Sequence, residues 1–111
     1  MRRCDQTPAW LELGAYYSAH GKDFDLRNAF VQDAERIGAF SQNAPHIFAD
    51  LSKNLLDAAA ERLLMQLARE CELPAQRDAM LQGEAINNTE QRAVLHTILR
   101  QNRHLARADT A

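Results

Sequence analysis

The clearest alternation of apolar and polar positions runs over residues 58–71. Apolar side chains recur there at steps of three and four, at Ala60, Leu63, Leu64, Leu67, Ala68 and Cys71. This spacing places them on one face of an α-helix and predicts a helix that buries that face. Asp57 stands just before the pattern and is a favourable N-cap residue. We expect Leu64 and Leu67 to be its most deeply buried residues.

Shorter helical patterns lie on both sides of this segment. The Thr-Pro pair at 7–8 is typical of a helix start, and Gly21 is suited to a left-handed stop. Asp25 can cap a second helix. After the long helix, Pro74 is suited to open a short helix and Gly83 to close it. The helical period fades between these patterns, and we interpret residues 39–51 as at most a short β-hairpin.

The stretch INNTEQRAVLHTILR, residues 86–100, predicts a last helix. Thr89 can serve as its N-cap, and Glu90 places negative charge at the positive end of the helix dipole. Its apolar positions follow a helical period at Val94, Leu95, Ile98, Leu99 and Leu105. A neighbouring face would carry a basic stripe, formed by Arg92, His96, Arg100, Arg103 and Arg107. A solvated or internally paired face is the ordinary interpretation of that stripe, and phosphate binding is the alternative.

These elements predict an all-α chain of about five helices, with the short hairpin, in one domain spanning 1–111. The net charge of −2 does not favour a polyanion binder, and no aromatic residue follows Phe48 to stack on bases beside the stripe. We therefore expect no nucleic-acid partner. No apolar run is long enough to cross a membrane, and two lone cysteines without a secretory signal fit the cytoplasm.

Candidate chemistry is sparse. Cys4 and Cys71 lack the spacing of a metal site, and the four histidines are scattered. The acidic group formed by Glu70, Glu72 and Asp78 is best interpreted as ordinary charged surface. We therefore expect no catalytic, cofactor-binding or metal-ligating residue in this chain.

Five stretches of the chain carry a resemblance to one family. They are TPAW at 7–10, FVQDAERIGAF at 30–40, SKN at 52–54, LARECEL at 67–73 and MLQGEAINNTEQRAVLHTILR at 80–100. In this order they resemble the N-terminal part of the glucose-6-phosphate isomerase family, also called phosphoglucose isomerase. The most specific piece is the N-x-T-E-x-R-A-V-L-H run at 87–96.

The resemblance implies that the chain is the helical N-terminal part of a larger α/β fold. Members of this family have two sugar-isomerase domains, which this chain lacks. They interconvert glucose 6-phosphate and fructose 6-phosphate in glycolysis and gluconeogenesis, usually as homodimers in the cytoplasm and without a cofactor. The family's catalytic glutamate, histidine, lysine and arginine lie beyond the matching segment, so no residue here inherits a catalytic role.

Two functions therefore follow from the sequence. The first is a structural part of the isomerase, inactive alone, whose partner is the remainder of the isomerase chain. The second is an independent small all-α binding or assembly module that reuses this segment. After Arg100 the sequence QNRHLARADTA departs from the family pattern.

Overall fold

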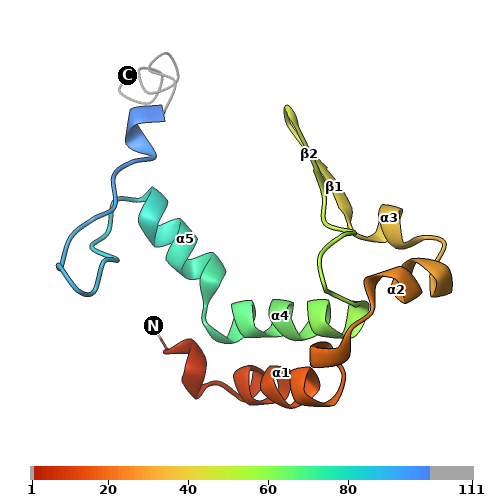
Figure 1. Cartoon of the computed structure of the whole chain (residues 1–111). Helices are drawn as coiled ribbons and strands as arrows, with labels where there is room; N and C mark the ends of the chain where they lie inside the picture. Colours follow the sequence, from red (N-terminus) through yellow and green to blue (C-terminus); the bar gives the residue numbers. More distant parts are fainter. Residues whose placement is uncertain (1, 101–111) are drawn as a thin grey trace. The chain divides into compact units, whose positions relative to one another are not determined.

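A computed structural model of the chain describes residues 2–100. That part of the chain contains five α-helices and one antiparallel hairpin (Figure 1). The helices are α1 Pro8–Ala19, α2 Leu26–Gln32, α3 Arg36–Ala39, α4 Ala58–Glu70 and α5 Leu73–Leu81, and the strands are β1 Ser41–Ala44 and β2 Ile47–Asp50. Short 3₁₀ helices occupy Cys4–Gln6, Gly21–Asp23 and Ile98–Arg100. The contacts divide the chain into a unit spanning Arg2–Glu70 and a unit that begins at Cys71.

Helix α1 begins as the sequence predicts. The Thr7 hydroxyl accepts a hydrogen bond from the Trp10 N–H at 3.3 Å, and a proline occupies the first turn. The prediction of a left-handed stop at Gly21 is wrong, because in residues 2–100 the only glycine with positive φ is Gly83. Gly21 instead opens a 3₁₀ turn. A Cβ there would lie 3.0 Å from a Tyr17 ring carbon, so glycine permits the close approach to this ring.

Helix α4 packs along α1 (Figure 1). Its predicted cap is confirmed, since Asp57 Oδ1 accepts from the Ala60 N–H at 2.8 Å. At the other end of α4, Glu70 accepts from the backbone N–H of Ala9 at 2.9 Å and from the Gln66 side chain at 3.0 Å. The end of α4 therefore satisfies a free N–H group at the start of α1.

The expected deep burial of Leu64 and Leu67 is wrong for Leu64. Its exposed fraction is 42%, Leu67 is half-buried, and no residue of α4 is fully buried. Within the Arg2–Glu70 unit α1 is the one helix that packs extensively on α4, so the apolar face of α4 is wider than the surface that covers it.

Arg36 forms the centre of the region that follows α1. It is 3% exposed, and its guanidinium donates from Nε to the Ser52 carbonyl at 2.8 Å and from Nη2 to the Asn54 carbonyl at 2.9 Å. Three rings surround it at 4.7 to 5.6 Å, from Phe24, Phe30 and Phe40. These contacts join α2, α3 and the loop after the hairpin through cation–π attraction and two satisfied carbonyls.

The hairpin prediction at 39–51 is confirmed. Strands β1 and β2 pair antiparallel, from Ser41 opposite Asp50 to Ala44 opposite Ile47. In the two-residue turn between them, His46 has a left-handed φ of 64°. The strand pair is closed at its base by a bond from the Leu51 N–H to the Phe40 carbonyl, at 2.8 Å.

In the second unit, α5 begins and ends at the predicted residue types. A proline lies in its first turn, and Gly83 follows its end with a φ of +78°. The Gly83 N–H donates to the Met80 carbonyl at 3.1 Å and the Glu84 N–H to the Ala79 carbonyl at 3.0 Å. This pair of bonds is the Schellman motif that a left-handed glycine permits.

The predicted last helix is wrong over residues 89–100. Residues 87–92 form a tight loop instead, closed by a bond from the Asn87 N–H to the Arg92 carbonyl at 3.0 Å. Asn87 Oδ1 accepts from the N–H groups of Thr89 and Glu90, both at 3.2 Å. The Asn87 side chain thus takes the acceptor role expected of Thr89 and favours a turn over a helix.

The basic stripe therefore does not form as predicted. Arg92 closes the loop at 87–92, His96 lies in a turn after it, and Arg100 ends a 3₁₀ helix, so these three do not share a helical face. Leu95, Ile98 and Leu99 of the expected apolar face are exposed, and Val94 is half-buried. The rest of the predicted helix, including Arg103, Leu105 and Arg107, lies outside the described residues.

Replacing Arg36 tests the centre of the first unit. Arg36→Met should lower the free energy of unfolding by about 2–4 kcal/mol, because two carbonyls lose their donor and three rings lose their cation. Arg27→Met, at an exposed arginine of α2, should change it by less than about 0.5 kcal/mol. Urea unfolding followed by circular dichroism measures both, and equal losses would contradict the assignment of Arg36 as the centre.

Candidate functional site

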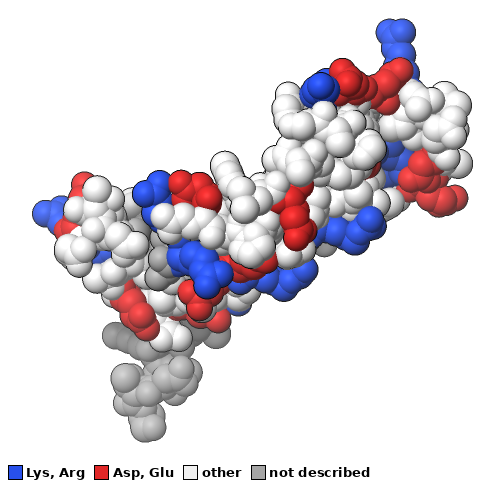
Figure 2. Space-filling view, turned by 90° about the horizontal axis from the view of Figure 1, so that it is seen from below, with Lys and Arg blue, Asp and Glu red and all other residues white. Residues whose placement is uncertain are grey.

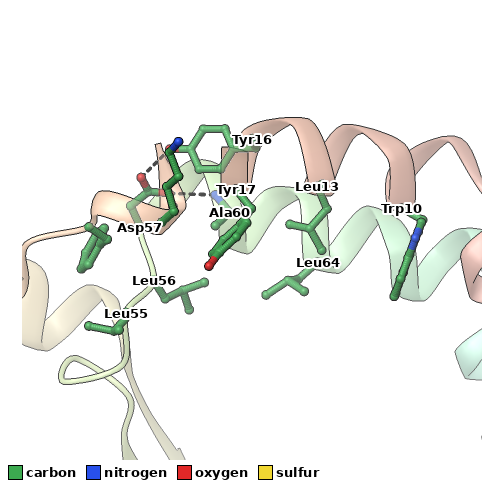
Figure 3. Close-up of a pocket in the computed structure, with 13 residues that line it drawn as sticks. Trp10, Leu13, Tyr16, Tyr17, Leu55, Leu56, Asp57, Ala60 and Leu64 are labelled. Atoms are coloured by element: carbon green, nitrogen blue, oxygen red, sulfur yellow. Dashed lines mark hydrogen bonds between the residues drawn. The ribbon is translucent and has the colours of Figure 1, made fainter. Parts of the chain in front are cut away.

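An apolar groove lies in the Arg2–Glu70 unit, along α1, α4 and the loop before α4 (Figure 3). Its volume is about 560 Å³. Its walls are formed by Trp10, Leu13, Gly14, Tyr16, Tyr17, Gly21, Lys22, Phe24, Leu55, Leu56, Asp57, Ala60 and Leu64. Figure 3 shows Trp10 and Leu13 of α1 directed to the same side as Leu64 of α4.

The groove is open, and its large apolar side chains are poorly covered. Exposed fractions are 45% for Trp10, 62% for Tyr17, 70% for Leu55 and 42% for Leu64. Single exposed apolar residues are ordinary on protein surfaces, but a contiguous set around one hollow indicates an interaction surface.

Asp57 and Tyr16 form a hydrogen-bonded polar pair in the groove wall, which also includes Lys22. The Tyr16 hydroxyl donates to Asp57 Oδ2 across the two helices. Burial opposes the charge on Asp57, but hydrogen bonds from Tyr16 and from the N–H groups of Ala60 and Ala59 outweigh it, so its pKa lies below the ordinary 3.8. The same bond to Asp57, together with burial and the carboxylate charge, raises the pKa of Tyr16 above 10.0.

This arrangement is suited to holding an apolar surface. The Asp57 carboxylate already accepts from Tyr16 and from the backbone of α4, so its hydrogen bonds serve the packing of the two helices. Among residues 2–100 no group of three or more His, Cys, Asp or Glu side chains could hold a metal ion. That the chain contains no catalytic residue stays a prediction.

The histidines and cysteines considered from the sequence lie apart from one another. His20 lies beside Tyr16 with ring centroids 5.0 Å apart, and His46 lies in the hairpin turn. Cys4 is exposed and Cys71 half-buried, both as free thiols. His104 lies outside the described residues.

The sequence did not reveal the contact between Tyr16 and Asp57. Asp57 was identified only as a cap, and Tyr16 lies 41 positions away along the chain. The available signal was the apolar pattern of both segments, which is compatible with packing of one helix on the other but does not specify which polar groups meet.

Charged groups of both signs are interspersed on the face shown in Figure 2. The ion pairs found within residues 2–100 are local, joining Arg3 to Asp5 and Arg77 to Asp78, each at 2.8 Å. The charges on that face therefore do not mark a binding surface of one sign, and the groove is the better candidate site. Within this same part of the chain, no helix is long and apolar enough to cross a membrane.

The comparisons with known proteins agree on one family. The family model described as phosphoglucose isomerase matches residues 50–109. The match continues past Arg100, so the expected departure from the family pattern at that residue is wrong. A glucose-6-phosphate isomerase of Polaromonas naphthalenivorans (strain CJ2) is 62% identical over 98 residues, which are 88% of this chain and 19% of the relative. A protein of the same name from Leptothrix cholodnii (strain ATCC 51168 / LMG 8142 / SP-6) is 58% identical over 104 residues, which are 94% of this chain and 19% of that relative. The chain thus spans about a fifth of the length of these relatives.

The bond between Tyr16 and Asp57 should depend on pH. Tyr16→Phe should lower the free energy of unfolding by about 1 kcal/mol at pH 7. The pKa of Asp57 is lowered on folding, so the ionised carboxylate stabilises the folded state above pH 3.8. This stabilisation is lost as pH falls through the lower pKa of the folded state. The difference in free energy of unfolding between Tyr16→Phe and the original chain should therefore become smaller below pH 3.8.

The neighbouring tyrosine provides the control. Tyr17 is 62% exposed, and Tyr17→Phe should change the free energy of unfolding by less than about 0.5 kcal/mol at any pH. Urea titrations of the three proteins between acidic and neutral pH measure these differences. A loss for Tyr16→Phe that is independent of pH would contradict the pairing with an ionised Asp57.

Proposed function

Because the chain belongs to the phosphoglucose isomerase family, we propose that it is the N-terminal helical part of a glucose-6-phosphate isomerase. The observation that carries this proposal is 57–62% identity over 88–94% of the chain to proteins of that name. The complete enzyme would interconvert glucose 6-phosphate and fructose 6-phosphate, in glycolysis and gluconeogenesis. We place it in the cytoplasm, as a homodimer that uses no cofactor.

The proposed role of residues 1–111 is structural. Isomerisation of a phosphosugar requires a base beside C2, a group that opens the ring and a site that holds the phosphate, all within hydrogen-bond reach of the substrate. The groove instead offers mostly apolar walls, and its carboxylate is bound to Tyr16 and to the backbone. The partner of this segment is then the remainder of the isomerase chain, which holds the sugar-isomerase domains.

An independent all-α binding or assembly module remains the second candidate. It is favoured by the Arg2–Glu70 unit, which has internal contacts of its own around Arg36 and between α1 and α4. The two candidates differ in what they require, because only the first needs a further segment of chain to become active.

A chimera tests the proposed function. Residues 1–111 would replace the matching segment of the Polaromonas naphthalenivorans isomerase, in a host that lacks its own isomerase. We expect the chimera to convert fructose 6-phosphate to glucose 6-phosphate with kcat/KM within about tenfold of the relative. A tenfold difference corresponds to ~1.4 kcal/mol in the free energy of the transition state. The chain alone should show no turnover in the same coupled assay.

The matched control is the relative with its matching segment deleted, which should be inactive. A folded but inactive chimera would contradict the isomerase proposal and favour the independent module. Saturable turnover by the chain alone would contradict its structural role.

A further inference from the structure

Helices α1 and α4 differ in how their apolar residues are distributed. Helix α1 has one charged residue, Glu12, and its large apolar side chains point in several directions, as Trp10, Leu11 and Tyr16 do. Helix α4 has a single apolar face and a charged opposite face that includes Arg62 and Arg69. An amphipathic helix is typical of a protein surface, whereas a helix that is apolar on all sides is typical of an interior.

Within the Arg2–Glu70 unit, helix α1 is covered on the side that faces α4. Ala9, which lies beside Glu70 of α4, has no exposed surface. On other sides of the same helix, Leu11 is 72% exposed and Tyr17 is 62% exposed. Within the Arg2–Glu70 unit, therefore, α1 has the composition of a buried helix and the exposure of a surface helix.

We propose that the apolar groove is the surface on which the remainder of the isomerase chain docks, so that this remainder covers more of α1, which supplies five of the lining residues, than of α4, which supplies two. This inference rests on the proposed function. The relatives supply the occupant, because they match this chain at 57–62% identity and are about five times as long. A segment with bulky apolar side chains, from the part of the enzyme that this chain does not contain, fills the groove beside Trp10, Leu13 and Leu64.

The satisfied carboxylate of Asp57 in the groove wall is compatible with an apolar occupant. Asp57 is bound by Tyr16 and by the start of α4, so docking does not leave this carboxylate buried without a partner. The energy of docking then comes mainly from apolar surface, at about 25 cal/mol for each Å² removed from water.

Two adjacent residues of α4 provide a matched pair of variants. Leu64 and Met65 are 42% and 55% exposed, but only Leu64 lines the groove. In the isolated chain, Leu64→Asp and Met65→Asp should have similar effects on Tm, because both side chains are about half exposed. In the chimera, Leu64→Asp should lower Tm by about 5 °C or more, and Met65→Asp should lower it much less.

Leu64→Ala is a milder variant that tests the same position if Leu64→Asp does not fold. In the chimera it should retain isomerase activity and lower Tm more than Met65→Ala does. If the active chimera tolerates Leu64→Asp as well as the isolated chain does, or if both positions respond equally, the docking proposal is wrong while the isomerase proposal stands. If the unsubstituted chimera is folded but inactive, the isomerase proposal itself fails.

The size of the isolated chain in solution tests the other occupant. A dimer that Leu64→Asp converts to a monomer, while Met65→Asp does not, would show that a second copy fills the groove and would overturn the proposal. A monomer in all three cases agrees with an occupant that the isolated chain lacks.

Discussion

The incomplete covering of α1 is the constraint on which the groove and its proposed occupant depend. Burial of apolar surface is the main force that stabilises a folded chain, and α1 offers such surface on several sides. Within the Arg2–Glu70 unit, α4 covers one of these sides, and the bonds of Glu70 to Ala9 and of Tyr16 to Asp57 fix the two helices to each other. The groove is one part of this helix pair that the Arg2–Glu70 unit leaves without a covering layer.

Arg36 presents the opposite situation in the same unit. Its charge is almost completely buried, yet two carbonyls accept its protons and three phenylalanine rings surround it. This local centre is satisfied by contacts within the Arg2–Glu70 unit, whereas the apolar groove is not covered by that unit. The unit thus combines a centre whose polar groups are satisfied with an apolar surface that the unit leaves exposed.

The helix starts and the hairpin could be predicted because they depend on neighbours in sequence. Thr7, Asp25 and Asp57 each accept from an N–H group at most three residues away. The centre at Arg36 could not be predicted in this way, because its carbonyl partners lie 16 and 18 residues further along the chain. The groove also depends on packing between distant segments, so its residues were evident only as apolar patterns.

The last helix fails as a prediction for a local reason. The sequence pattern at 86–100 favours a helix, but the side chain of Asn87 bonds to the backbone two and three residues ahead and stabilises a turn. Apolar periodicity indicates which faces of a helix can be buried. It gives no information about side-chain bonds to the backbone that compete with the helix. The family resemblance through the same residues was nevertheless correct, because it depends on their identity and order.

Hydrogen exchange at the α1 amides tests the central claim most directly. It would compare the isolated chain with the active chimera, using the α4 amides as the internal reference. If the remainder of the enzyme covers α1, protection of the α1 amides should increase in the chimera by more than protection of the α4 amides. Equal changes in the two helices would contradict the claim that α1 is the helix enclosed by the complete enzyme.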